Sequence, residues 1–273
     1  MTPSAAKLYL DLMKKCLTNT IYGEHEYRKV DSRNPLKRLI DRGFNAAGVT
    51  LVRSNTFVRE DREKGLDWPP FAHTMVGMRR LDNLQACVEE ILESRVPGDL
   101  IETGVWRGGV TIFMRAILAA YGVEDRTVWV ADSFRGLPPP DPSRYPADRG
   151  DRHHEVTALS IPCDEVRENF AKYGLLDSQV RFLDGWFRDT LPAAPISRLA
   201  LMRLDGDMYE STMDALVNLY PRLSPGGYVI VDDFNAVEAC RRAVGDYRSA
   251  HNITEPISAI DDIAVFWRRS LGA

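Results

Sequence analysis

From residue 100 to residue 231, short apolar runs alternate with longer segments of helical periodicity. The apolar runs predict buried strands, and the segments between them predict helices. Strands are expected at 100–102, 127–130, 180–183, 199–204 and 228–231, and helices at 109–120, 164–173 and 208–223. Such alternation is typical of a parallel sheet with helices on both faces. The chain is therefore predicted to form a doubly wound α/β fold, with Ser224-Pro225-Gly226-Gly227 as the turn into the strand at 228–231.

The flanking segments predict how this sheet is extended. An opening helix is expected over residues 5–20, with Leu8, Leu12, Cys16 and Leu17 on one face, and a longer helix over 72–95 is expected to pack on the sheet. Residues 24–68 are charged and lack a sustained period, which predicts a long loop or partial lid. The runs 257–260 and 264–267 predict an antiparallel edge. We therefore expect a helical N-terminal extension over 1–70 and one α/β domain over 71–273.

The amino-acid composition limits which binding partners and which cellular compartment are expected for this protein. The 273 residues are 44% hydrophobic, which is enough for one large core, and the net charge of −4 is spread without a basic face, so nucleic acid is an unexpected partner. No apolar run approaches the ~18 residues of a membrane span, and the N-terminus has no signal-like segment, so a cytoplasmic protein is expected. The four cysteines form no C-x-x-C pair, which predicts neither a disulfide framework nor a zinc site.

Acidic side chains follow two of the expected strands. Asp205 and Asp207 come after 199–204, and Asp232 and Asp233 come after 228–231. Parallel neighbours lie about 5 Å apart, so these carboxylates should emerge side by side and raise one another's pKa unless a cation neutralises them. Oxygen ligands of this kind suit Mg²⁺, Mn²⁺ or Ca²⁺. The alternative is that Asp207 and Asp233 cap the N-termini of the helices that follow.

A glycine-containing loop follows the strand expected at 100–102. It runs from Glu102 to Gly109 with a G-x-x-x-G-G pattern, and glycines there allow a ligand to approach the backbone at a helix N-terminus. Glu102 would repel a pyrophosphate and would suit an ammonium or sulfonium group. Asp132, after the next strand, stands where an acid accepts hydrogen bonds from ribose hydroxyls. The alternative is a tight packing turn without a ligand.

A third loop, Asp184-Gly185-Trp186-Phe187, would reach the same crevice. An aromatic side chain there could cover a purine, or Trp186 and Phe187 could simply fill core space. Together the three loops indicate S-adenosylmethionine, with adenosine near Asp132 and Trp186 and the amino-acid tail near Glu102 and Gly104.

These residues resemble the class I methyltransferases with their Rossmann-like sheet. More closely, they resemble the macrocin O-methyltransferase family, which methylates sugar hydroxyls on macrolide and aminocoumarin antibiotics. The resemblance covers roughly residues 68–269, and the segments that carry it are 71–78, 102–109, 129–136, 166–170, 204–207 and 227–233.

The resemblance implies a set of site residues and a magnesium ion. The ion would be held by Asp205, Asp232 and Asp233. The cofactor would be held by Thr74, Met75, Glu102, Thr103, Gly104, Val105, Trp106, Asp132, Ser133, Phe134, Arg135, Gly136, Asp184, Trp186, Phe187 and Asp205.

The resemblance also bears on the general base and on the N-terminal region. It favours His153, in the polar loop 148–157, over His154 as the base, with Asp207 as the rival; either histidine could instead be an ordinary exposed loop residue. Residues 31–60 look longer than, or different from, the family pattern. This region contributes acceptor and subunit contacts in the family, and the resemblance implies a homo-oligomer that acts on a small glycosylated molecule. The competing functions are a catechol-type O-methyltransferase, a metal-dependent phosphoesterase and a cofactor-binding scaffold without turnover.

Overall fold

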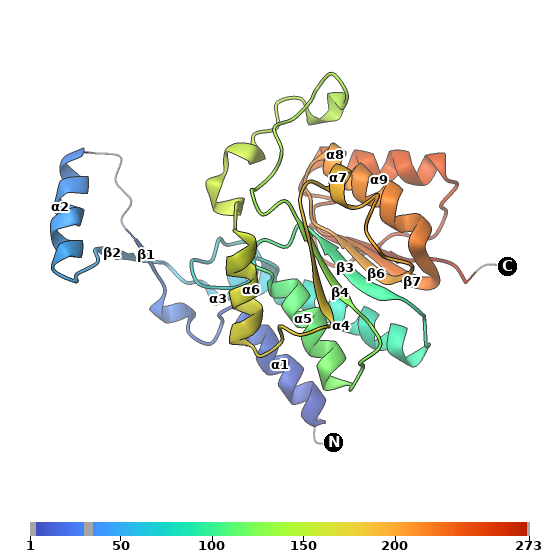
Figure 1. Cartoon of the computed structure of the whole chain (residues 1–273), viewed down its shortest axis with the longest axis horizontal. Coiled ribbons are helices and arrows are strands. Elements are labelled where there is room, and N and C mark those ends of the chain that lie inside the picture. Colours follow the sequence, from blue (N-terminus) through green and yellow to red (C-terminus); the bar gives the residue numbers. More distant parts are fainter. Residues whose placement is uncertain (1–3, 30–34, 272–273) are drawn as a thin grey trace.

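A seven-stranded sheet forms the centre of the protein, whose structure is a computed structural model that describes residues 4–29 and 35–271 (Figure 1). The strands are β3 (Asp99–Thr103), β4 (Val128–Asp132), β5 (Val180–Asp184), β6 (Leu199–Leu204), β7 (Leu223–Val231), β8 (Ser258–Ala259) and β9 (Val265–Arg268). Their order is β5-β4-β3-β6-β7-β9-β8. The first five in this order are parallel, and β9 runs antiparallel to both β7 and β8. The predicted doubly wound, mostly parallel sheet with an antiparallel edge is confirmed.

Helices cover both faces of this sheet and divide the interior into two apolar cores. On one side lie α1 (Ala5–Leu17), α4 (Met78–Glu93), α5 (Gly109–Ala120) and α6 (Cys163–Lys172); on the other lie α7 (Phe187–Thr190), α8 (Tyr209–Leu219) and α9 (Glu238–Ala250). All six residues of β6 are buried, and Leu201 and Met202 point into different cores because successive strand residues face opposite sides. A strand buried on both faces explains why 199–204 reads as a continuous apolar run.

The opening helix is shorter than predicted, and of the leucines expected on its apolar face it buries Leu17 but not Leu8 or Leu12. Leu10, Met13 and Leu17 pack in the core against α5, whereas Leu8 and Leu12 are 54% and 53% exposed. The face with Leu8 and Leu12 and the face with Leu10 and Met13 both have apolar residues at helical spacing. The direction from which α5 approaches decides which face is buried, and the sequence of α1 does not encode that direction.

The expectation of a long loop over 24–68 is wrong. Strand β1 (Tyr27–Lys29) pairs antiparallel with β2 (Val52–Ser54), α2 (Pro35–Ala46) lies between them in sequence, and α3 (Arg59–Lys64) follows. Figure 1 shows β1, α2 and β2 extending away from the sheet as an arm. The pattern was missed because the strands have three residues each and because four charged residues and a glycine interrupt the apolar residues of the helix. Residues 31–34, part of the region that differs from the family pattern, lie outside the described residues.

A buried arginine fixes the base of this arm. Arg62 of α3 is 2% exposed and donates hydrogen bonds to both carboxylate oxygens of Glu26 and to Asp67. This ion pair holds residues 65–68 against the body of the protein, where they help to line the cavity described below.

The expected turn at residues 224–227 is instead part of β7. Between the paired positions Leu199–Leu223 and Leu201–Tyr228, β7 contains more residues than β6, so the strand bulges there, and Gly226 adopts a positive φ of 82°. The bulge keeps this segment in the sheet where a turn was expected. Within residues 4–29 and 35–271, no helix has the length and apolar character that crossing a bilayer requires.

Candidate active site

A cavity of about 440 Å³ opens at the carboxyl ends of the parallel strands. Loops after β3, β4, β5, β6 and β7 line it, together with residues 65–68 and 74–76. The cavity lies where ligands bind in open α/β sheets. Of the predicted site residues, those that line it are Thr74, Met75, Glu102, Gly104, Val105, Trp106, Asp132, Ser133, Gly136, His153, Trp186, Phe187, Asp205, Asp207, Asp232 and Asp233. Four others, Thr103, Phe134, Arg135 and Asp184, lie outside this lining.

Gly104 brings two of these loops into backbone contact. It has a φ of +85°, and a Cβ atom at this position would lie 1.6 Å from the carbonyl oxygen of Asp205. Only glycine permits that approach. At the other end of the loop, Gly109 also makes a backbone contact: its N–H donates a hydrogen bond to the carbonyl of His73 at 2.9 Å. The loop is therefore tightly packed and also lines the cavity, and its contact with a ligand remains a prediction.

Asp132 organises the backbone around this loop. Its Oδ2 accepts a hydrogen bond from the N–H of Val105 at 2.7 Å, and its Oδ1 accepts one from the N–H of Phe134 at 2.8 Å. Burial raises the pKa of Asp132, and these backbone hydrogen bonds oppose the rise. The carboxylate thus joins the loop after β3 to the loop after β4.

Three residues other than glycine adopt positive φ angles in these loops. They are Trp106 at 48°, Phe134 at 56° and Asp207 at 55°, in the loops after β3, β4 and β6. Such backbone is strained for residues with a Cβ atom, and it concentrates at functional sites. The Trp106 indole N–H donates to the carbonyl of Ala158 at 2.9 Å, so the strained turn also holds the long loop between β4 and α6.

Trp186 and Phe187 are half-buried and line the cavity. Phe187 also packs against the core beneath α8. Phe187 therefore fills core space, as the alternative predicted, and stacking of Trp186 or Phe187 on a purine remains a prediction.

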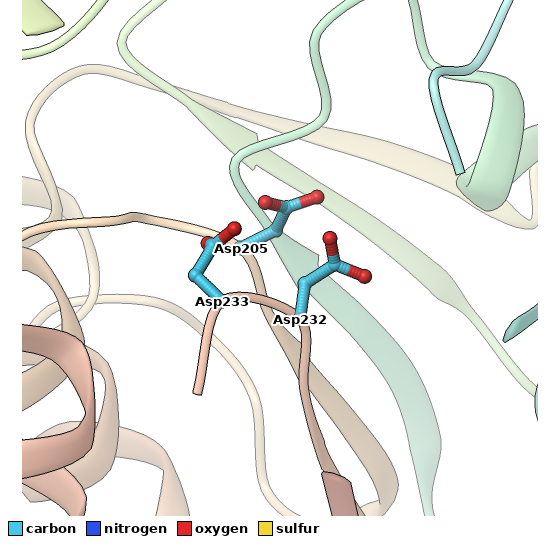
Figure 2. Close-up of side chains that lie close together, drawn as sticks. All are labelled: Asp205, Asp232 and Asp233. Carbon is cyan, nitrogen blue, oxygen red and sulfur yellow. The ribbon is translucent and has the colours of Figure 1, made fainter. Parts of the chain in front are cut away.

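Asp205, Asp232 and Asp233 gather at the ends of β6 and β7, as Figure 2 shows. One carboxylate oxygen from each lies within 4.8 Å of the others. Burial raises the pKa of Asp205 and of Asp233, and the neighbouring carboxylates raise both further. Three negative groups on one side of a buried cavity fit a shared divalent cation.

The helix-capping alternative for Asp207 and Asp233 is wrong. The N-cap residues of α8 and α9 are Met208 and Val237, neither with a side-chain capping bond in the described structure. The first N–H groups of α8 instead donate to Asp148, whose carboxylate accepts from Tyr209 at 2.7 Å and from Glu210 at 3.0 Å. This contact joins the loop of His153 to the helix that follows Asp207.

Sequence reasoning missed two buried arginines in the same cluster. Arg203 of β6 donates to Glu102, to Oδ2 of Asp205 at 2.7 Å, and to Asp232. Arg80 of α4 donates to Oδ2 of Asp232 at 2.7 Å. Burial raises the pKa of Glu102, and the charge of Arg203 opposes that rise. An arginine inside the apolar run 199–204 was the only sequence signal, because a buried charge requires a partner.

His153 and Asp207 both line the cavity, while His154 is exposed. Nδ1 of His153 lies 2.6 Å from Oδ2 of Asp151, a residue that sequence reasoning also missed. Burial alone would lower the pKa of His153, but the hydrogen bond to Asp151 and the charge of Asp207 raise it. Burial, followed by the charge of Asp205, raises the pKa of Asp207 to about 7.

Comparison with solved structures places this fold among the Rossmann-like methyltransferases. The O-methyltransferase NovP is 47% identical, with a TM-score of 0.85 over 97% of this chain and 99% of that chain. The calicheamicin methyltransferase CalS11, 18% identical with a TM-score of 0.60 over 88% and 95% of the two chains, shares the fold. The chain belongs to the macrocin-O-methyltransferase (TylF) family, whose model matches residues 6–269. It is an O-methyltransferase that depends on S-adenosylmethionine.

Curated relatives match over almost the whole chain. A Streptomyces olivaceus protein named 8-demethyl-8-(2,3-dimethoxy-alpha-L-rhamnosyl)-tetracenomycin-C 4'-O-methyltransferase is 55% identical over 99% of this chain and 95% of its own. Mycinamicin III 3''-O-methyltransferase of Micromonospora griseorubida is 50% identical over 99% and 100%. Demethyldecarbamoylnovobiocin O-methyltransferase of Streptomyces niveus is 48% identical over 98% and 96%. These relatives favour methyl transfer over the phosphoesterase and scaffold alternatives.

Two glycine substitutions test the close approach at Gly104. Gly122, after α5, also has a positive φ, of 64°, but a Cβ atom there would meet nothing within 4 Å. Gly122→Ala is expected to cost about 1 kcal/mol of unfolding free energy from backbone strain alone. Gly104→Ala is expected to cost about 1–3 kcal/mol more because its Cβ displaces the Asp205 loop. Urea unfolding measures both; equal losses would contradict the proposed role of this contact.

Proposed function

We propose that this enzyme transfers the methyl group of S-adenosylmethionine to a hydroxyl of a deoxysugar on a glycosylated natural product of the macrolide or aminocoumarin type, assisted by Mg²⁺. The observation that carries the proposal is that the acidic cluster and the glycine-loop residues line one cavity. A hydroxyl-bearing acceptor at the cluster would therefore lie beside the methyl donor. The rhamnosyl group in the name of the Streptomyces olivaceus relative supports a sugar-bearing acceptor. Because the three relatives are named for different molecules, the proposal rests on the sugar.

The cavity fits the cofactor in size and in polar groups. A volume of about 440 Å³ is in the range of small-molecule sites. Oε2 of Glu102 is buried and has no hydrogen-bond partner among the described residues, so it can accept a bond from the ammonium group of the amino-acid tail. We assign Asp132 and Trp186 to the adenosine. When bound, S-adenosylmethionine supplies an electrophilic methyl group.

The acidic cluster fits Mg²⁺ in donor type and in charge. Asp205, Asp232 and Asp233 offer carboxylate oxygens, the ligands that Mg²⁺ prefers. Together with Glu102 and Asp207, which line the same cavity, they make a group of five carboxyl groups. In the described part of the chain, two guanidiniums, those of Arg80 and Arg203, bind members of this group. The arginines therefore leave negative charge for a cation to neutralise. When bound, Mg²⁺ supplies a Lewis acid that lowers the pKa of an alcohol.

The protein itself would accept the hydroxyl proton and orient the acceptor. We assign proton acceptance to His153 and keep Asp207 as the rival, since both line the cavity. An ionised Asp151 can only accept a hydrogen bond, so its contact with Nδ1 keeps a proton on that nitrogen and leaves Nε2 as the base. Positioning an acceptor beside the donor also removes part of the entropic barrier.

Removal of the cation tests the metal role. A chelator is expected to abolish methylation reversibly. Asp205→Asn and Asp232→Asn are expected to lower turnover of a glycosylated macrolactone by several orders of magnitude while changing the affinity for S-adenosylhomocysteine far less. Exposed Asp125→Asn, before β4, is the matched control. Mass spectrometry of products from glycosylated macrolactones and from catechols separates this proposal from the catechol-type alternative. Undiminished activity in chelator would exclude the metal role.

The general base can be tested with two adjacent histidines. His153→Gln is expected to lower kcat by about 10²–10⁴-fold, because the variant lacks the proton acceptor. His154→Gln changes an exposed neighbour and should leave kcat near that of the wild type. If His153→Gln keeps its activity and Asp207→Asn loses it, Asp207 is the base.

We also propose that the protein is a homo-oligomer, which rests on the surface of the arm. Its large apolar side chains include Tyr27, Ile40, Phe44, Val49 and Val52, each between 41% and 46% exposed in the single chain. Exposed apolar clusters favour protein contacts. Sedimentation is expected to give a multiple of the mass of one chain, and Phe44→Asp is expected to weaken the assembly. A monomer at all concentrations would contradict the proposal.

A further inference from the structure

Asp232 is held from both sides by arginines. Its Oδ1 accepts a hydrogen bond from Nη2 of Arg203, and its Oδ2 accepts one from Nη1 of Arg80 at 2.7 Å. Arg203 is 2% exposed and Arg80 is 7% exposed, so both guanidiniums are removed from water. Asp205, by contrast, contacts one arginine through one oxygen.

The two arginines come from different parts of the fold. Arg203 is paired in register with Glu102 of β3 and Ile230 of β7, and its guanidinium spans the gap between Glu102 and Asp232. Arg80 lies in the first turn of α4 and uses Nε to bind Oδ2 of Asp261 at 2.7 Å. An alternating row of charges therefore runs from β3 to the turn before β9.

Asp261 is itself fixed by the backbone of its turn. Its Oδ1 accepts hydrogen bonds from the N–H groups of Ile263 and Ala264 at 2.9 and 2.8 Å. Arg80 thus connects a rigid turn at the antiparallel edge to one of the cluster carboxylates. Because the planar guanidinium donates to both acids from fixed directions, it sets the direction of the Asp232 carboxylate.

We propose that Arg80 and Arg203 are positioning residues that orient Asp232 for the cation before the cation binds. The inference rests on the proposed metal site and extends it to residues beyond the three ligands. Hydrogen bonds at both oxygens stop the carboxylate from rotating and leave only its remaining lone pairs for the ion. Asp205 and Asp233 keep more freedom to adjust. Groups that orient ligands in this way typically change metal affinity by about 10–100-fold when they are replaced.

Arg80→Lys is the sharpest test, because it keeps the positive charge and removes the planar guanidinium, whose two nitrogens bind Asp232 and Asp261. Mn²⁺ is the probe, titrated by calorimetry into the full chain without acceptor. The Mn²⁺ affinity is expected to fall about tenfold or more, while the affinity for S-adenosylhomocysteine stays within about threefold. Arg115→Lys is the matched control: Arg115 is similarly buried and binds Asp177 through two nitrogens, away from the cavity.

The outcomes separate this inference from the proposed function. If wild-type protein binds no Mn²⁺ or Mg²⁺, the proposed metal role fails. If the wild type binds Mn²⁺ and Arg80→Lys binds it equally well or more tightly, the positioning role is overturned. A lower melting temperature with unchanged Mn²⁺ affinity would show a purely structural role and would overturn it as well.

A second variant keeps the inference testable if Arg80→Lys fails to fold. Asp261→Asn keeps the Oδ1 acceptor for the turn and removes the acceptor for Nε of Arg80, because the amide nitrogen that replaces Oδ2 is a donor. Its Mn²⁺ affinity is expected to fall less than that of Arg80→Lys, though clearly more than that of Arg115→Lys. An affinity equal to that of the wild type would overturn the inference.

Discussion

The buried guanidinium of Arg203 makes the acidic end of the sheet possible. It lies between Glu102 on β3 and Asp232 after β7, and it also binds Asp205. Carboxylates removed from water repel one another and lose hydration unless positive charge compensates them. Because Arg203 belongs to β6, that compensation is built into the sheet itself. The cluster can then stay in place, and the proposed Mg²⁺ would complete its neutralisation.

The position of the cavity follows from the strand order. The chain passes from β3 to β4 and β5 on one side and then crosses back to β6 and β7 on the other. The loops after β3 and β6 therefore leave the sheet in opposite directions and open a crevice between them. Gly104 holds these loops in backbone contact at the floor of the crevice. This contact brings the proposed methyl-donor residues and the proposed metal ligands together.

Other parts of the cavity come from segments far from the strand ends. Residues 65–68 reach it because Arg62 binds Glu26 and Asp67, and the loop of His153 reaches it because Asp148 binds the start of α8. The relatives that match this chain are named for different molecules. Irregular segments held at a few points by buried polar contacts can change in sequence without disturbing the sheet, which is consistent with a shared reaction on different acceptors.

The sequence by itself determined the α/β sheet, its antiparallel edge and the family, because apolar periodicity and strand-end motifs are local signals. It also placed most of the site residues at one edge, since parallel strands end together. Only the tertiary structure decided which face of α1 is buried, that β1, α2 and β2 form an arm where a loop was expected, and that 224–227 form a bulge. The same holds for the ion pairs of Arg80 and Arg203, which join residues up to 181 positions apart in the chain. Such contacts depend on the directions in which helices and loops approach one another, and no local pattern encodes those directions.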